Sequence, residues 1–217
     1  MQQLQLYRER ELPGSALCYV MDPMCSWCWA YQPVLQALLA SDRLTTPLLY
    51  VMGGLAPENE QPMAATTRQQ IETIWRHIEA RTGVRFNYDF WQHNIPRRST
   101  YPACKAVLAA EAALPGSFSE MIGAIQQAYY AQARNPSERA TLTAIASEIG
   151  IDAGRFDALM NAEPQTEALY RHLRFRDQLR VEGYPSLVWW RQGEAIPVTY
   201  GYCDLETTLA QLRRAGY

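Results

Sequence analysis

Short apolar runs and a helical pattern follow one another near the start of the chain. Residues 16–21 (ALCYVM) and 48–52 (LLYVM) are continuously apolar and brief, which is typical of strands that are buried on both faces. Between them, apolar residues recur at helical intervals from Trp29 to Leu39. This succession of strand, helix and strand predicts a βαβ unit with two parallel strands.

The middle of the chain has a different pattern. From about residue 57 to residue 180, apolar residues keep helical spacing and strand patterns are scarce. Asn135-Pro136 has the composition of a helix start, in which a capping side chain is followed by proline in the first turn. The pattern therefore predicts a large helical segment inserted between two parts that form a sheet.

Strand patterns return near the end of the chain. Residues 186–190 (SLVWW) and 196–200 (IPVTY) flank Gln192-Gly193, which suits a hairpin turn. Asp204 is placed to cap a last amphipathic helix. The predicted order is thus β-α-β, several helices, then β-β-α.

Composition and charge exclude several classes of protein. The chain has 217 residues, of which 48% are hydrophobic, so it is long enough for a substantial core. Its formal net charge of −2 gives no bulk attraction to nucleic acid or to an anionic membrane. Charged residues at 8–11 stand where a signal peptide needs an apolar run, so we expect a cytoplasmic protein, without nucleic-acid or membrane partners.

The stretch DPMCSWCW contains the candidate chemistry, because Cys25 and Cys28 are two residues apart directly after the first predicted strand. Such a pair can be a metal clamp, a structural disulfide or a redox pair. A thiolate zinc site needs four ligands, and neither another pair nor a suitably spaced histidine is present, so we expect no metal site. An odd count of five cysteines, with no export signal, argues against a disulfide-stapled secreted domain.

The redox interpretation needs only the two cysteines. At the first turn of a helix, Cys25 would meet unpaired backbone N–H groups and the positive end of the helix dipole, and both favour a thiolate. Cys28 would share that helix face and could attack a mixed disulfide formed at Cys25. We therefore predict that Cys25 is the exposed nucleophile and Cys28 the shielded resolving thiol, with their disulfide as the redox group and no organic cofactor.

These features together resemble a known family. A C-x-x-C at a strand–helix junction, Pro33 within the helix, the helical insertion and Gly183-Tyr184-Pro185 before the hairpin resemble the thioredoxin fold, most closely its DsbA-like family. The segment DPMCSWCW followed by that insertion is similar to the FrnE-like disulfide isomerases. The resemblance implies an α/β thioredoxin-like domain at residues 1–58 and 165–217, interrupted by a helical insertion at 59–164.

The resemblance also implies substrate-binding residues. The family proline that matches Pro185 is cis and lies beside the disulfide, and the residue before it, here Tyr184, pairs with an extended substrate segment. Taken alone, an X-Pro bond here would be expected to be trans. Trp27, between the cysteines, is expected to offer an apolar surface to the substrate. The expected partners are protein or peptide thiols and disulfides, with glutathione as a further candidate.

Two other interpretations stay open. Related glutathione-dependent transferases and 2-hydroxychromene-2-carboxylate isomerases use the same fold, and there Cys25 would only replace a serine. A non-catalytic module could instead use the C-x-x-C to hold a metal together with a partner's ligands. The sequence also leaves open whether the enzyme is an oxidant, a reductant or an isomerase; the compartment favours reduction or isomerisation.

Overall fold

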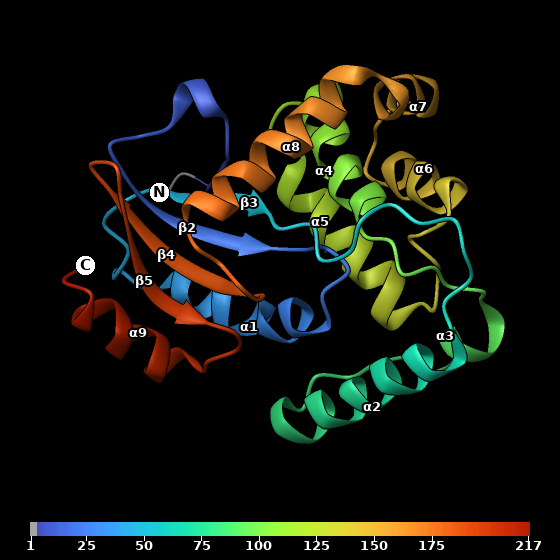
Figure 1. Cartoon of the computed structure of the whole chain (residues 1–217), viewed down its shortest axis with the longest axis horizontal. Coiled ribbons are helices and arrows are strands. Elements are labelled where there is room, and N and C mark those ends of the chain that lie inside the picture. The colour runs from blue at the N-terminus through green and yellow to red at the C-terminus, as the bar shows by residue number, and fades with distance from the viewer. Residues whose placement is uncertain (1–3) are drawn as a thin grey trace. The chain divides into compact units, whose positions relative to one another are not determined.

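The computed structural model describes residues 4–217, so the first three residues of the predicted thioredoxin-like domain lie outside the described part. Its strands and helices are β1 (Leu4–Leu6), η1 (Glu9–Glu11), β2 (Ser15–Met21), α1 (Ser26–Ala40), β3 (Leu48–Met52), α2 (Ala65–Thr82), α3 (Asp89–His93), α4 (Tyr101–Ala113), α5 (Phe118–Gln126), η2 (Gln127–Ala131), α6 (Arg139–Glu148), α7 (Ala153–Asn161), α8 (Glu163–Gln178), β4 (Ser186–Arg191), β5 (Glu194–Tyr200) and α9 (Leu205–Arg214). The predicted order β-α-β, helices, β-β-α is confirmed (Figure 1).

The chain forms two compact units. One contains the residues up to Gly53 together with Tyr170–Tyr217, and the other contains Gly54–Leu169. The first boundary lies directly after β3 and the second lies inside α8. The predicted thioredoxin-like domain at residues 1–58 and 165–217 and the predicted insertion at 59–164 stay a prediction.

The strands within residues 4–217 form one five-stranded sheet in the order β1-β3-β2-β4-β5. β1 and β2 both run parallel to β3, whereas β4 is antiparallel to β2 and to β5. The short strand β1 was missed by the sequence analysis, because three residues at an edge carry too little pattern to be recognised. β2 is central to the sheet, which explains why it is almost continuously apolar.

Side chains of β2 alternate between the two faces of this sheet. Cys18 and Val20 belong to a cluster with Phe175 of α8, whereas the Tyr19 ring lies 5.9 Å from the ring of Tyr31 on α1. Figure 1 shows α1 and α9 on one face and α8 on the other. β2 ends at Met21, and the chain then turns into α1 at the carboxyl end of this strand.

The unit Gly54–Leu169 has an aromatic core of its own. The ring of Trp75 on α2, which is fully buried, lies 4.8 Å from both Phe86 and Trp91. The rings of Tyr129 and Tyr130, in the π-helical turn η2, also contact Trp75. Burial of several large rings explains how this segment can form a compact unit without a sheet.

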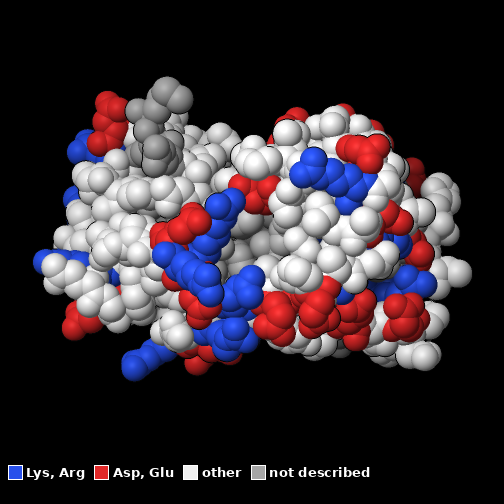
Figure 2. Space-filling view, turned by 90° about the horizontal axis from the view of Figure 1, so that it is seen from above, with Lys and Arg blue, Asp and Glu red and all other residues white. Residues whose placement is uncertain are grey.

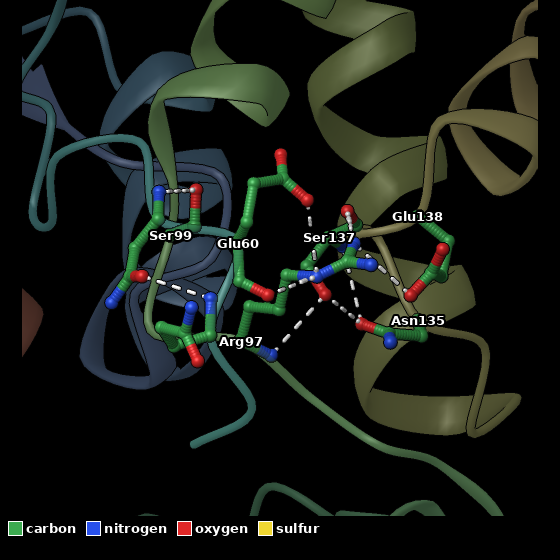
Figure 3. Close-up of polar contacts among 8 residues, drawn as sticks. Glu60, Arg97, Ser99, Asn135, Ser137 and Glu138 are labelled. Carbon is green, nitrogen blue, oxygen red and sulfur yellow. Dashed lines mark hydrogen bonds and ion pairs between the residues drawn. The ribbon is translucent and has the colours of Figure 1, made fainter.

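Arg97 connects three segments of the helical unit. Its guanidinium donates to the backbone oxygens of Glu60 and Ser137, and it forms ion pairs with the carboxylates of Glu60 and Glu138 (Figure 3). Beside it, Asn135 accepts from the backbone and the hydroxyl of Ser137. The predicted helix start at Asn135 is therefore wrong: Asn135 stabilises a turn, and α6 begins at Arg139.

The charge of the surface and the hydropathy of the helices bear on the expected partners. Acidic and basic residues both occur on the face drawn in Figure 2, in agreement with the small net charge. None of the helices between residues 4 and 217 combines the length and the apolar character that crossing a bilayer requires.

Candidate active site

A short buried turn places Cys25 at the start of α1. Asp22, which is fully buried, accepts the backbone N–H of Met24 with its carboxylate at 2.8 Å and that of Cys25 with its carbonyl at 3.0 Å. Cys25 is the N-cap residue with extended backbone angles, and its carbonyl accepts the N–H of Trp29. The Asp-Pro sequence therefore turns the chain sharply from β2 into the helix.

The two thiols differ in their environment. Both are free in this structure, and their side chains are hydrogen-bonded to each other. Cys28 is fully buried, whereas Cys25 keeps 6% of its surface exposed. Cys25 is thus the more accessible thiol but much less exposed than the sequence analysis expected. Burial, and next the contact with Cys25, raises the pKa of the Cys28 thiol well above its ordinary range.

Tyr184 and Pro185 lie next to Cys25, although they are far along the chain. The Tyr184–Pro185 peptide bond is cis, as the family resemblance implied. The Cys25 thiol donates to the backbone oxygen of Tyr184 over 3.7 Å. On the other side of the proline, the Gly201 N–H donates to the Pro185 oxygen at 2.7 Å and links this loop to the end of β5.

The side chain of Tyr184 lies over Gly53, at the end of β3. Its hydroxyl donates to the Gly53 carbonyl at 2.7 Å, and Arg176 of α8 donates to the same oxygen at 2.7 Å. Sequence analysis missed both neighbours of the ring. A glycine directly after a strand and an arginine on a charged helix are both common patterns, and neither contains information about a contact across the sheet.

Trp27 occupies the first turn of α1, between the two cysteines. It is half-buried, and its ring lies 5.6 Å from the ring of Tyr202 in the loop between β5 and α9. Tyr202 in turn contacts Tyr31 edge-on. Sequence analysis missed Tyr202, which had no recognisable motif. The indole is therefore held against a second aromatic residue, with part of its surface open to a ligand.

The remaining cysteines lie outside the C-x-x-C motif. Cys18 and Cys104 are fully buried, and burial raises the pKa of Cys18; Cys203 is half-buried. Within residues 4–217, no group of three or more His, Cys, Asp or Glu side chains is arranged to hold a metal ion.

Comparison with known proteins agrees with this geometry. The family model described as a DSBA-like thioredoxin domain matches residues 17–213. A "putative protein disulfide isomerase" from Nitrosomonas europaea is 25% identical, with a TM-score of 0.81 over 93% of this chain and 97% of that one. The cytosolic disulfide reductase DsbM from Pseudomonas aeruginosa is 26% identical, with a TM-score of 0.71 over 92% and 97%. DsbM has also been solved with GSH.

Curated relatives include adapter proteins. The ClpXP adapter protein SpxH of Bacillus subtilis is 22% identical over 199 residues, which is 88% of this chain and 65% of that protein. SpxH of Halalkalibacterium halodurans is 22% identical over 84% of this chain and 61% of its own length. The chain thus spans less than two thirds of the length of these two relatives.

Proposed function

The chain belongs to the family of DsbA-like thioredoxin domains, and from this premise we propose that it is a thiol–disulfide oxidoreductase that uses Cys25 and Cys28. The observation that carries the proposal is the place of the Cys25 sulfur. It lies at the first turn of α1, is hydrogen-bonded to the Cys28 thiol and faces the carbonyl before a cis proline. No organic cofactor or metal takes part, because the dithiol itself carries the two electrons.

In the proposed reductive half-reaction, the Cys25 thiolate attacks one sulfur of a substrate disulfide. A Cys25–substrate disulfide forms, the substrate S–S bond breaks, and the second substrate sulfur leaves as a thiolate that takes up a proton. The attack requires the thiolate form of Cys25, because the thiolate is the nucleophile in thiol–disulfide exchange. Cys25 suits this role because it is the more accessible of the two thiols.

Cys28 completes the reaction. Its thiolate attacks the sulfur of Cys25, the mixed disulfide breaks, and the first substrate sulfur leaves as a thiol. The substrate has then gained two electrons, and the protein holds a Cys25–Cys28 disulfide, which an external thiol must reduce. Burial raises the pKa of Cys28, which favours its protonated form while Cys25 makes the first attack. The proton that Cys28 then gives up goes to the leaving substrate sulfur.

Reduction or isomerisation is the direction we propose, with protein or peptide disulfides as substrates and glutathione as a candidate thiol partner. A 26% identical structure is described as a cytosolic disulfide reductase, and the same protein was solved with GSH. These matches support a cytoplasmic location and a reductive role. The extended backbone of the substrate would pair with Tyr184, and Trp27 would contact its apolar side chains.

We also propose that the helical unit is an insertion in the thioredoxin-like domain.

Two substitutions test the mechanism. In an insulin-reduction assay with glutathione as the reductant, we expect Cys25→Ser to abolish turnover. Pre-reduced Cys28→Ser that is mixed with insulin in the absence of glutathione should instead accumulate a Cys25–substrate mixed disulfide, which mass spectrometry of the intact protein detects. Cys18→Ser serves as the matched control, since it removes a thiol that is not part of the pair. Unchanged turnover in Cys25→Ser would remove the proposed nucleophile, and unchanged turnover in Cys28→Ala would favour a glutathione-dependent transferase or isomerase.

A second candidate function is that of an adapter, which the SpxH relatives favour by their name. This role needs a binding surface and not a thiol, so it predicts that Cys25→Ser keeps the function. The metal-binding alternative predicts stoichiometric zinc in protein purified under reducing conditions. The reduction potential of the Cys25–Cys28 pair against glutathione would set the direction of electron flow.

A further inference from the structure

We propose that Gly53 and Arg176 are positioning residues, which anchor the ring of Tyr184 and thereby hold the Tyr184 backbone at the Cys25 sulfur. This inference rests on the proposed function, in which that backbone pairs with the substrate. It concerns two residues that lie outside the C-x-x-C motif and that come from β3's end and from α8.

Gly53 makes room for the ring. A Cβ atom at position 53 would lie 2.5 Å from Cζ and 2.9 Å from Cδ1 of Tyr184, far inside the usual carbon–carbon contact distance. The backbone of Gly53 is also fixed, because its N–H donates at 2.7 Å to the carbonyl of Met21, the last residue of β2. Any side chain at residue 53 would therefore displace the ring rather than the strand.

Arg176 and the Tyr184 hydroxyl together saturate the Gly53 carbonyl. Each donates to it at 2.7 Å, which uses both acceptor sites of the oxygen. The guanidinium is oriented by its neighbour Asp177, whose carboxylate accepts from Nε and Nη2 at 2.8 and 2.7 Å. The Arg176 side chain is 20% exposed and that of Asp177 is 65% exposed, so the guanidinium is largely shielded from water whereas the carboxylate is not.

The contacts of Gly53 and Arg176 reach the site through one residue, Tyr184. The Tyr184 ring packs against the apolar cluster between the sheet and α8, while its carbonyl faces Cys25. One end of Tyr184 is thus fixed in the core and the other end lies at the nucleophile. Loss of the anchor should leave the thiol chemistry intact but should misplace the backbone that an extended substrate needs.

The test compares two disulfides in single-turnover reactions of pre-reduced protein, so that no recycling partner is required. One is a synthetic peptide with an internal disulfide, which needs the Tyr184 backbone. The other is DTNB, which is a small molecule without a peptide backbone that could pair with Tyr184. For the peptide, we expect Gly53→Ala to raise the half-saturating concentration about tenfold or more, and Arg176→Gln to raise it about 2- to 10-fold.

Three further variants separate positioning from general damage. Arg176→Lys should partly restore peptide binding, because it keeps a charged donor. Arg174→Gln is the matched control, since it removes an exposed charge from the same helix outside this contact. In a Tyr184→Ala background, Gly53→Ala should have no further effect, because the ring that it would strike is gone.

The outcomes distinguish this inference from the proposed function. Raised half-saturation for the peptide, with DTNB rates within about twofold of wild type, supports it. Two results would overturn the positioning role alone. One is a wild-type half-saturating concentration of the peptide in both Gly53→Ala and Arg176→Gln. The other is that Gly53→Ala has the same effect in the Tyr184→Ala background as in the wild type. A wild-type protein that reduces neither disulfide overturns the proposed function and this inference with it.

Discussion

His172 should make the stability of the protein depend on pH. It is fully buried on α8, and its Nδ1 accepts the backbone N–H of Met52 at 3.0 Å. This hydrogen bond requires an unprotonated Nδ1. Burial, and to a lesser extent the charge of Arg171, lowers the pKa of His172 to about 3, while a hydrogen bond with the Tyr7 backbone acts in the opposite direction. The substitution His172→Gln tests whether this histidine makes stability depend on pH.

The magnitude follows from the difference in proton binding. Below its ordinary pKa of 6.5, the unfolded chain protonates His172, whereas the folded chain does not do so until pH approaches 3. The unfolded state therefore binds more protons, and the free energy of unfolding falls as pH falls from 6.5 towards 3. Between pH 7 and pH 5, this single group should lower the stability by about 2 kcal/mol.

Urea unfolding at pH 7 and pH 5 measures this contribution. The wild type should lose about 2 kcal/mol more than His172→Gln over this interval, because the other titrating groups are common to both proteins. His77→Gln is the control, since it removes an exposed histidine. Equal losses in wild type and His172→Gln would refute the argument that burial keeps this histidine neutral.

Three other predictions concern stability and thiol reactivity. Arg97→Met should destabilise the helical unit by about 2 kcal/mol in urea unfolding, because two backbone oxygens lose a charged donor. Glu60→Gln and Glu138→Gln should each destabilise it by less than about 1 kcal/mol, since these carboxylates are exposed. Equal losses of stability in the three variants would assign the effect to the ion pairs. Asp204→Ala should cost about 1 kcal/mol, because Asp204 accepts the N–H of Thr207 at the start of α9, and Glu206→Ala is the exposed control in the same turn. Alkylation of the native protein followed by mass spectrometry should leave Cys18 and Cys104 unmodified until urea is added, since both are fully buried; their early modification would contradict the described core.

Local patterns in the sequence were sufficient for much of the fold. The runs ALCYVM and LLYVM are strands because a central parallel strand is covered on both faces, so its whole length must be apolar. Asp204 caps the last helix as its position indicates. The start of α6 was misread, because the same Asn-Pro pattern also suits a tight turn, and contacts around Arg97 and Ser137 select the turn.

The sequence by itself determined the element order and the C-x-x-C at a strand–helix junction, since both depend on neighbours within a few residues. Only the tertiary structure decided that Tyr184 faces Cys25, 159 residues away, and that its ring is seated on Gly53 beside Arg176. Such contacts depend on which strand ends meet at one edge of the sheet. Hydrophobic periodicity specifies which face of a strand is buried, but it does not specify which distant side chain fills the space beside a glycine.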